Sequence, residues 1–362
     1  MAAKSKRSPR RLVLRFYSER YLLLTLLSFV VSVSITRLFL EITGYPQLGS
    51  NELHFAHVLW GGLIWFAGSL FQLIFANHRA LDISAVLTGI GVGLFIDEVG
   101  KFITQTNNYF YPAAAPIIYS FFLVTLFIFS LIRKKRNITL REKLYYTLEQ
   151  FEEVLEGDLS KVERDRMIGE LSAFSKQEDA TDLQRLAKYF KNILEDKNQI
   201  VTIHQPDAFD KVNTWWFGIK EKLFSEKKKP AWLFAIWLLI GMISILHPTV
   251  SLFAARLGFS LPGFWNEFIK INLNLTQGIG LMERLRLAGE ALIGVLLVFS
   301  AGAGFLGSKR MGTNVAYVSL LLLIVLVNLL VFFFDQFSAI IFTIIQFAVF
   351  FLTRQYRLIL NR

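Results

Sequence analysis

Eight apolar stretches, each long enough to cross a bilayer, constrain this chain more than any other feature of its sequence. A helix needs about 20 mostly apolar residues to span the hydrocarbon core. Because no water is available there to bond the backbone, such stretches must be helices rather than open strands. The sequence therefore predicts an all-α, polytopic helical membrane protein with about eight transmembrane helices. The stretches are residues 21–40, 55–76, 83–104, 113–132, 231–247 (which is short), 288–307 (which begins with charges), 313–334 and 337–353.

Lysine and arginine are distributed unevenly about these stretches. In an eight-span arrangement, 33 of the 39 basic residues share one side of the membrane. Cytoplasmic loops carry such an excess, so we expect both termini in the cytoplasm and the protein in the plasma membrane, most simply a bacterial inner membrane. No small-residue cleavage site follows the basic N-terminus, which predicts an uncleaved first helix. The remaining six basic residues are Arg37, Lys101, Arg256, Lys270, Arg284 and Arg286.

The net charge of +11 largely reflects this excess of basic residues on one side of the membrane. A nucleic-acid-binding protein would need a basic surface interleaved with base-stacking aromatic residues, and the sequence has no such pattern. The chain also contains no cysteine, which excludes disulfides, thiolate catalysis and cysteine-ligated metals.

The spans divide four and four around a charged segment, which predicts three parts. Residues 1–132 form an N-terminal four-helix membrane half, residues 133–230 a cytoplasmic helical insert, and residues 231–362 a C-terminal four-helix membrane half. Three short helices can bury only a small core, so we expect the insert to lean on the membrane helices or on a protein partner. Helical periodicity predicts these three helices at residues 138–157, 158–174 and 180–197.

Two further stretches have the pattern of helices that lie in the headgroup region. Residues 207–229 place a pair of tryptophans beside a lysine run, which is typical of the inner interface. The alternative for this stretch is a fourth helix of the insert. Residues 261–275, on the outer side, gather apolar and aromatic side chains on one face.

Ionisable residues cluster at adjoining ends of the second and third spans. His54 and His57 begin the second span, and Asp97, Glu98 and Lys101 end the third. The short link at 76–82 forces these spans to run antiparallel, so the start of one meets the finish of the other. Charge at membrane depth is costly, which makes such groups functional-site candidates. The sequence predicts an outward-facing polar site.

The histidines of this cluster suggest a divalent metal such as zinc. His54 and His57 are three residues apart and share one helical face. His247, at the predicted outer end of the fifth span, could supply a third nitrogen. Asp97 or Glu98 could act as ligand or base, but successive helix positions point about 100° apart, so both are not expected to face the histidines. The candidate metal ligands are His54, His57, Glu98 and His247.

A purely structural account of the same residues stays open. Asp97 could pair with Lys101 and Arg37 with Glu41, each at a spacing of four. Paired charges of this kind can simply let helices pack. The small residues of both helices would permit close approach: Gly61, Gly62, Gly89, Gly91 and Gly93.

Two blocks of the N-terminal half resemble those of a family of uncharacterised bacterial multi-pass membrane proteins. They read ELHFAHVLWGGL and GVGLFIDEVGKFIT, the latter followed by NNYFYPAAAPIIY, and cover residues 50–120. This resemblance implies a helical membrane protein. A looser similarity, to transmembrane zinc amide hydrolases such as alkaline ceramidases, lies in membrane-embedded His and Asp. The chain lacks that superfamily's late H-x-x-x-H helix, so no zinc ligands are carried over.

Three functions are compatible with these features. A metal-assisted hydrolase or transferase acting on a lipid or extracytoplasmic substrate would use Asp97 or Glu98 as catalytic base and Lys101 to stabilise developing negative charge. A transporter would bind a cation or relay protons through the same residues, with Glu290 and Asn328 lining the path. A scaffold or signalling protein would act through the insert at 133–230.

Overall fold

The computed structural model describes residues 12–44, 57–133, 139–156, 159, 161–172, 182–195, 218, 231–257 and 280–361. Within those ranges the regular elements are all helices, and no strand occurs among them. Seven of the described helical stretches are long and apolar enough to cross a membrane. The chain is therefore an all-α multi-pass membrane protein, as its apolar stretches predict.

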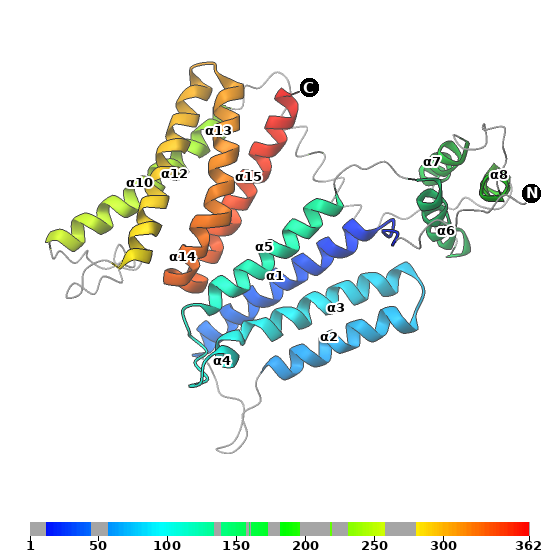
Figure 1. The fold of residues 1–362 in the computed structure, drawn as a ribbon, viewed down its shortest axis with the longest axis horizontal. Coiled ribbons are helices and arrows are strands. Elements are labelled where there is room, and N and C mark those ends of the chain that lie inside the picture. Colours follow the sequence, from blue (N-terminus) through cyan, green and yellow to red (C-terminus); the bar gives the residue numbers. More distant parts are fainter. Residues whose placement is uncertain are drawn as a thin grey trace, which may run out of the picture.

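The first group of helices, coloured from blue to cyan-green in Figure 1, lies side by side. α3 packs between α1 and α2, and α5 packs against α1. The outward faces of these helices are apolar: Trp60, Phe66 and Leu73 on α2 are more than half exposed. Such faces suit a hydrocarbon solvent. The group comprises α1 (Ser18–Thr43), α2 (His57–Ile74), α3 (His78–Asp97), α4 (Val99–Ile103) and α5 (Ala114–Ile132).

A second group, yellow to red in Figure 1, forms the C-terminal membrane bundle. Its core surrounds Trp237, whose indole Nε1 donates a hydrogen bond of 2.9 Å to Thr353 Oγ1. Its elements are α10 (Ala231–Leu257), α12 (Leu281–Phe305), α13 (Lys309–Leu322), the π-helical η1 (Leu323–Val327), α14 (Asn328–Asp335), the 3₁₀-helical η2 (Gln336–Ala339) and α15 (Ile340–Leu360).

The last apolar stretch makes two crossings. It is 52 residues long, Lys309–Leu360, or about 78 Å as a helix, more than twice the roughly 30 Å of a hydrocarbon core. The chain reverses at Gln336, whose φ is 48°, and α15 then packs back against α13. Together with the other six stretches this makes the eight crossings that the sequence predicts.

Two spans differ from their expected bounds. α10 does not end near residue 247 but continues through Pro248 to Leu257. Proline has no N–H to donate to the preceding turn, and next to it the Thr249 hydroxyl donates to the carbonyls of Ile245 and Leu246, each at 2.9 Å. α12 begins seven residues earlier than expected, at Leu281, and its Arg286 pairs with Glu290 one turn later.

The two membrane groups meet through α5 and α14. The ring of Tyr119 stacks on that of Phe332, with centroids 4.5 Å apart, and its hydroxyl donates to the carbonyl of Ile324 at 2.8 Å. Ile324 lies within η1, where the helical hydrogen-bond ladder changes spacing. A side chain of α5 thus donates a hydrogen bond to a backbone carbonyl of the C-terminal group.

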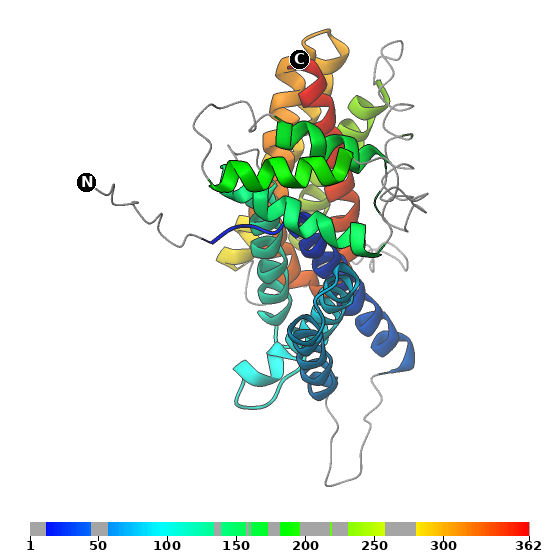
Figure 2. The ribbon, with the colours of Figure 1, turned by 90° about the vertical axis from the view of Figure 1, so that its right-hand side faces the viewer.

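The insert contains three described helices, α6 (Leu140–Glu156), α7 (Lys161–Ser172) and α8 (Asp182–Glu195), as predicted. They enclose a small core around Leu144, Met167 and Leu194. Figure 2 shows them lying across the axes of the membrane helices. The expected interfacial helices at 207–229 and 261–275 lie outside the described residues, apart from position 218.

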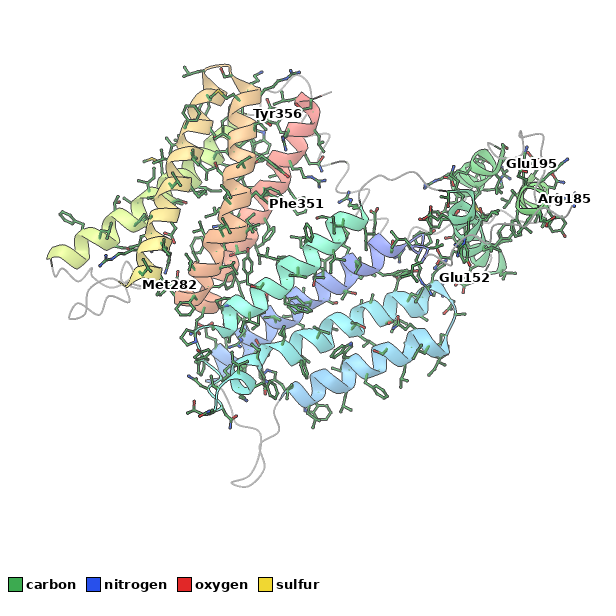
Figure 3. All side chains as sticks on the ribbon, viewed as in Figure 1. Glu152, Arg185, Glu195, Met282, Phe351 and Tyr356 are labelled. Atoms are coloured by element: carbon green, nitrogen blue, oxygen red, sulfur yellow. The ribbon has the colours of Figure 1, made fainter. Side chains whose placement is uncertain are left out.

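Glutamates of α6 attach the insert to the end of the N-terminal group at which α1 and α3 begin, where Figure 3 labels Glu152. Glu152 accepts a hydrogen bond from the backbone N–H of His78 at 2.6 Å. Glu149 accepts one from the N–H of Phe16 at 2.6 Å, and Glu153 one from the Tyr17 hydroxyl at 2.5 Å. The insert therefore leans on the membrane helices, which is one of the two arrangements its small core predicts.

Candidate functional site

The site lies where α2 begins and α3 ends, brought together by the short antiparallel link. Glycines allow the two helices to approach closely. A Cβ added to Gly61 would lie 2.7 Å from Phe95 N, and one added to Gly91 would lie 2.4 Å from Trp65 N. Gly62, which the sequence also suggested as a packing residue, has no atom within 4 Å of an added Cβ. Gly61 and Gly91 therefore set the distance between the two helices.

The opposite face of α3 packs on α1 through two more glycines. A Cβ at Gly89 would lie 1.9 Å from Ser28 Oγ, and one at Gly93 would lie 3.0 Å from Ser32 Oγ. Ser32 also donates across the contact to the carbonyl of Ile90 at 3.1 Å. As a result the end of α3 is held between α1 and α2.

A break in the helix directs two successive carboxylates toward these neighbours. α3 ends at Asp97, Glu98 is its C-cap with φ −90° and ψ 10°, and α4 starts at Val99. Both carboxylates are almost completely buried, at 0% and 1% exposure. They contact groups on both α1 and α2.

Arg37 of α1 is the main partner of Asp97. Its Nε donates to Asp97 Oδ1 at 2.5 Å and its Nη2 to the Asp97 carbonyl at 2.8 Å. The guanidinium is buried and lies between two rings, 4.1 Å from the centroid of Tyr109 and 3.8 Å from that of Phe337. This enclosed charge pair fixes α1 to the end of α3.

Tyr109 completes the coordination of Asp97. Its hydroxyl donates to Asp97 Oδ2 at 2.6 Å. Burial, together with the negative charge of Asp97, raises the pKa of the Tyr109 phenol. The phenol therefore remains a hydrogen-bond donor.

His57 joins the two carboxylates. Its Nε2 lies 3.1 Å from Asp97 Oδ2, and its Nδ1 lies 2.8 Å from Glu98 Oε1. Its backbone N–H also donates to Glu98 Oε1 at 3.0 Å. The imidazole side chain is 25% exposed and that of Lys101 is 24% exposed, whereas both carboxylates stay buried.

Lys101 is the second cation and lies beside Glu98. Its Nζ is 3.4 Å from Glu98 Oε1. Burial opposes ionisation of the Glu98 carboxyl, but the hydrogen bond and charge of His57 and the charge of Lys101 outweigh it and lower its pKa. Arg37 and Lys101 supply two positive charges against the two negative charges of Asp97 and Glu98, and the charge of a protonated His57 makes a third.

Three expectations about this cluster are wrong. Asp97 pairs with Arg37 rather than Lys101, and Arg37 therefore does not pair with Glu41. Asp97 and Glu98 both face His57, although they are successive residues. The reason is that the helix breaks at Glu98 and that His57 offers two ring nitrogens and a backbone N–H.

Three contributors were missed from the sequence as members of the site: Arg37, Tyr109 and Phe337. Arg37 had a signal, because it is a single charge among the apolar residues of the first span. Tyr109 follows the expected third span, and Phe337 is 280 residues from His57. Only the packing of α4, η2 and α1 brings these rings together.

A second charged network occupies the C-terminal group. Arg286 donates through both Nη atoms to Asp335, at 3.0 and 2.5 Å, and through Nε to Glu290 at 2.9 Å. His247 Nδ1 lies 2.7 Å from Glu290 Oε2. His247 is therefore not placed beside His57, since α10 and α2 lie on opposite sides of the molecule (Figure 1).

The polar residues suggested for a path are both buried. Glu290 belongs to the second network, whereas Asn328 donates to Gln346 Oε1 at 2.7 Å. Asn328 also lies 3.4 Å from the Tyr119 hydroxyl. It is thus part of the contact between the two membrane groups.

One turn links the two charged networks. Asp335, at the end of α14, holds Arg286, while Phe337, two residues later, covers Arg37. Between them, Gln336 Nε2 donates to the carbonyl of Phe110 at 3.3 Å, next to Tyr109. A displacement of this turn would change contacts in both networks.

The metal assignment remains a prediction. His54 lies outside the described residues, and within them no group of three or more His, Asp or Glu side chains is arranged to hold a metal ion. Asp97 already accepts from Arg37 and Tyr109, and Glu98 from His57. A metal at His57 would have to displace some of these donors.

Comparisons of the chain with protein-family models, with curated proteins and with solved structures found no match.

Proposed function

We propose that the protein is a proton-coupled membrane permease and that the network around His57 takes up the coupling proton. The observation that carries this proposal is the position of His57, a partly exposed imidazole that contacts two buried carboxylates. Histidine is the side chain whose unperturbed charge change falls between pH 5 and 8. Intramembrane clusters of this composition commonly mark proton relays.

The charge balance supports a change of state on protonation. Two cations and two carboxylates cancel while His57 is neutral, and a proton on His57 leaves one excess positive charge in a largely buried network. The groups that face His57 are Asp97, Glu98 and Tyr109, with Lys101 and Arg37 behind the carboxylates. A buried excess charge is costly, so the protonated network favours a rearranged set of partners.

The contact between the membrane groups offers a route for that rearrangement. The halves meet mainly through α5 and α14, and the Asp335–Phe337 turn touches both networks. Secondary transporters commonly move one bundle against the other around a polar site. Loss of the Arg37–Asp97 pair would release the cation that Phe337 covers.

A pH-jump measurement of charge movement tests the proposal without knowledge of the substrate. Purified protein in liposomes adsorbed to a solid-supported membrane is exposed to a rapid drop in pH, and the transient current is recorded. We expect a current in the wild type that is abolished in His57→Gln. His78→Gln, a histidine substitution at the inner end, is the matched control and should retain it. An unchanged current in His57→Gln at equal protein density would refute the proposal.

A metal-assisted hydrolase or transferase is the second candidate. The observation in its favour is that the His57 ring nitrogens lie within 3.1 Å of one carboxylate oxygen each of Asp97 and Glu98, with Lys101 beside Glu98. His54 would add a nitrogen, Glu98 would act as ligand or base, and the substrate would be a lipid or an extracytoplasmic ester or amide. Metal that co-purifies with the wild type and is lost in a folded His54→Ala/His57→Ala variant would favour it. If the wild type contained no metal and still gave the pH-jump current, the metal-assisted hydrolase or transferase would be excluded.

We further propose that this site faces the outside of a bacterial inner membrane, with both termini in the cytoplasm. The support is the excess of Lys and Arg on the opposite side of the spans. Because the native chain has no cysteine, single cysteines can be introduced without background. A cysteine near residue 48 should react with a membrane-impermeant thiol reagent in intact cells, and one near residue 136 should not; the reverse pattern would invert the topology.

A further inference from the structure

A cavity of about 90 Å³ lies between the two membrane groups. It is lined by side chains of α1, α5, α14, η2 and α15, segments that are as much as 300 residues apart. Representative lining residues are Val30, Val33, Ile118, Phe337, Ile344 and Phe347. None of the charged side chains of the two networks lines it, and its only link to them is Phe337, which also covers Arg37.

The lining is unsuited to water. Its only hydroxyls belong to Ser34, Tyr119 and Thr343, and that of Tyr119 already donates to the Ile324 carbonyl. A buried water requires two to four polar partners. Cavities lined by aliphatic and aromatic side chains stay dry and accept apolar ligands instead.

The surroundings indicate which apolar ligand is available. Every lining helix belongs to a membrane-crossing stretch. Ile344, on the wall formed by α15, is 53% exposed, so the cavity reaches the outer face of the bundle. In a membrane that face is in contact with lipid hydrocarbon rather than water.

We propose that this cavity binds an acyl chain of a bilayer phospholipid, which enters sideways between α1 and α15. This proposal does not depend on the permease proposal. The acyl chain would contact Phe337, whose ring centroid lies 3.8 Å from the Arg37 guanidinium. Occupancy would therefore steady the Asp335–Phe337 turn and the Arg37–Asp97 pair.

Adjacent valines on α1 provide a matched test. Val30 lines the cavity, whereas Val31 is 52% exposed on the outer face. Val30→Phe fills the cavity, and Val31→Phe adds the same atoms outside it. Ser34→Leu, which also fills the cavity with a smaller side chain, serves if Val30→Phe does not fold.

The measurement is the thermal unfolding temperature of delipidated full-length protein in detergent, with and without added phosphatidylglycerol of long or short acyl chains. Native mass spectrometry of the same samples counts bound lipid. We expect long-chain lipid to raise the unfolding temperature of the wild type and of Val31→Phe more than short-chain lipid does. Both the chain-length-dependent shift and the retained lipid should be lost in Val30→Phe or Ser34→Leu.

Two results would overturn the proposal. An equal shift with long and short chains would assign the effect to the headgroup. An undiminished long-chain shift in both cavity-filling variants would place the lipid elsewhere on the surface.

Discussion

Adding one methyl group at Gly61 should damage the site through the packing of the helices, without altering any charged residue. A Cβ at this position would lie 2.7 Å from Phe95 N and 2.8 Å from the Gly91 carbonyl oxygen. Ordinary contacts of a Cβ begin near 3.4 Å. Because the colliding atoms are backbone, side-chain rotation cannot relieve the overlap, and α2 and α3 must separate by about 0.7 Å.

That separation is large enough to disrupt the His57 contacts. His57 lies one helical turn from Gly61 on α2, and its Nε2 is 3.1 Å from Asp97 Oδ2. An added 0.7 Å would take this distance to about 3.8 Å, beyond the range of a hydrogen bond. Overpacking typically costs about 1–3 kcal/mol, and a lost hydrogen bond to a charged group costs about 1.5–3 kcal/mol. We expect Gly61→Ala to lower the free energy of unfolding by about 3 kcal/mol.

Gly62→Ala is the control, since an added Cβ there meets no atom within 4 Å. Alanine favours helix over glycine by up to about 1 kcal/mol, so this variant should be as stable as the wild type or more stable. The assay is thermal unfolding of both variants in the same detergent, followed by circular dichroism. If Gly61→Ala were no less stable than Gly62→Ala, the close approach of α2 and α3 and the reasoning built on it would be refuted.

Two further predictions concern the charged residues. Arg37→Gln and Asp97→Asn should each destabilise the protein by about 3–5 kcal/mol, because each leaves the opposite charge buried and unpaired. The double variant should lose clearly less unfolding free energy than the two single variants lose in sum. If the two losses were additive in unfolding measurements, the pairing would be contradicted. For Glu98, whose pKa is lowered in the folded protein, the stabilisation is complete above the unfolded value of about 4.3 and is lost as the pH falls through the lowered folded value. Acidification below pH 5 should lower the unfolding temperature less in Glu98→Gln than in the wild type. If unfolding temperature fell in parallel with pH in both proteins, Glu98 would have no role in acid sensitivity.

The sequence was sufficient for the number of crossings and the position of the polar site. Hydrophobic length predicts spans because the hydrocarbon core sets a minimum helix length, and the eight expected stretches correspond to α1, α2, α3, α5, α10, α12, α13–α14 and α15. The short link between the second and third spans placed His57 against Asp97 and Glu98 because it leaves only an antiparallel arrangement.

The sequence did not predict which charged side chains pair with one another within the cluster. Spacing along one helix suggested Asp97 with Lys101 and Arg37 with Glu41, yet Arg37 reaches across from α1 to Asp97. Helical spacing reports only neighbours on the same helix, whereas the rotation of each helix is set by packing. Here the positions of Gly89, Gly91 and Gly93 on α3 decide which faces of α1 and α2 meet it.

By itself the sequence determined that this protein is a multi-pass helical membrane protein with ionisable residues where its second and third spans adjoin, since the length and order of apolar segments are local properties. Only the tertiary structure decided that both carboxylates share one histidine, that His247 belongs to a separate network with Glu290, and that Phe337 covers Arg37. These contacts join residues 40 to 300 positions apart, and they depend on helix rotation and on the reversal at Gln336. Neither property has a signature in the periodicity of a single segment.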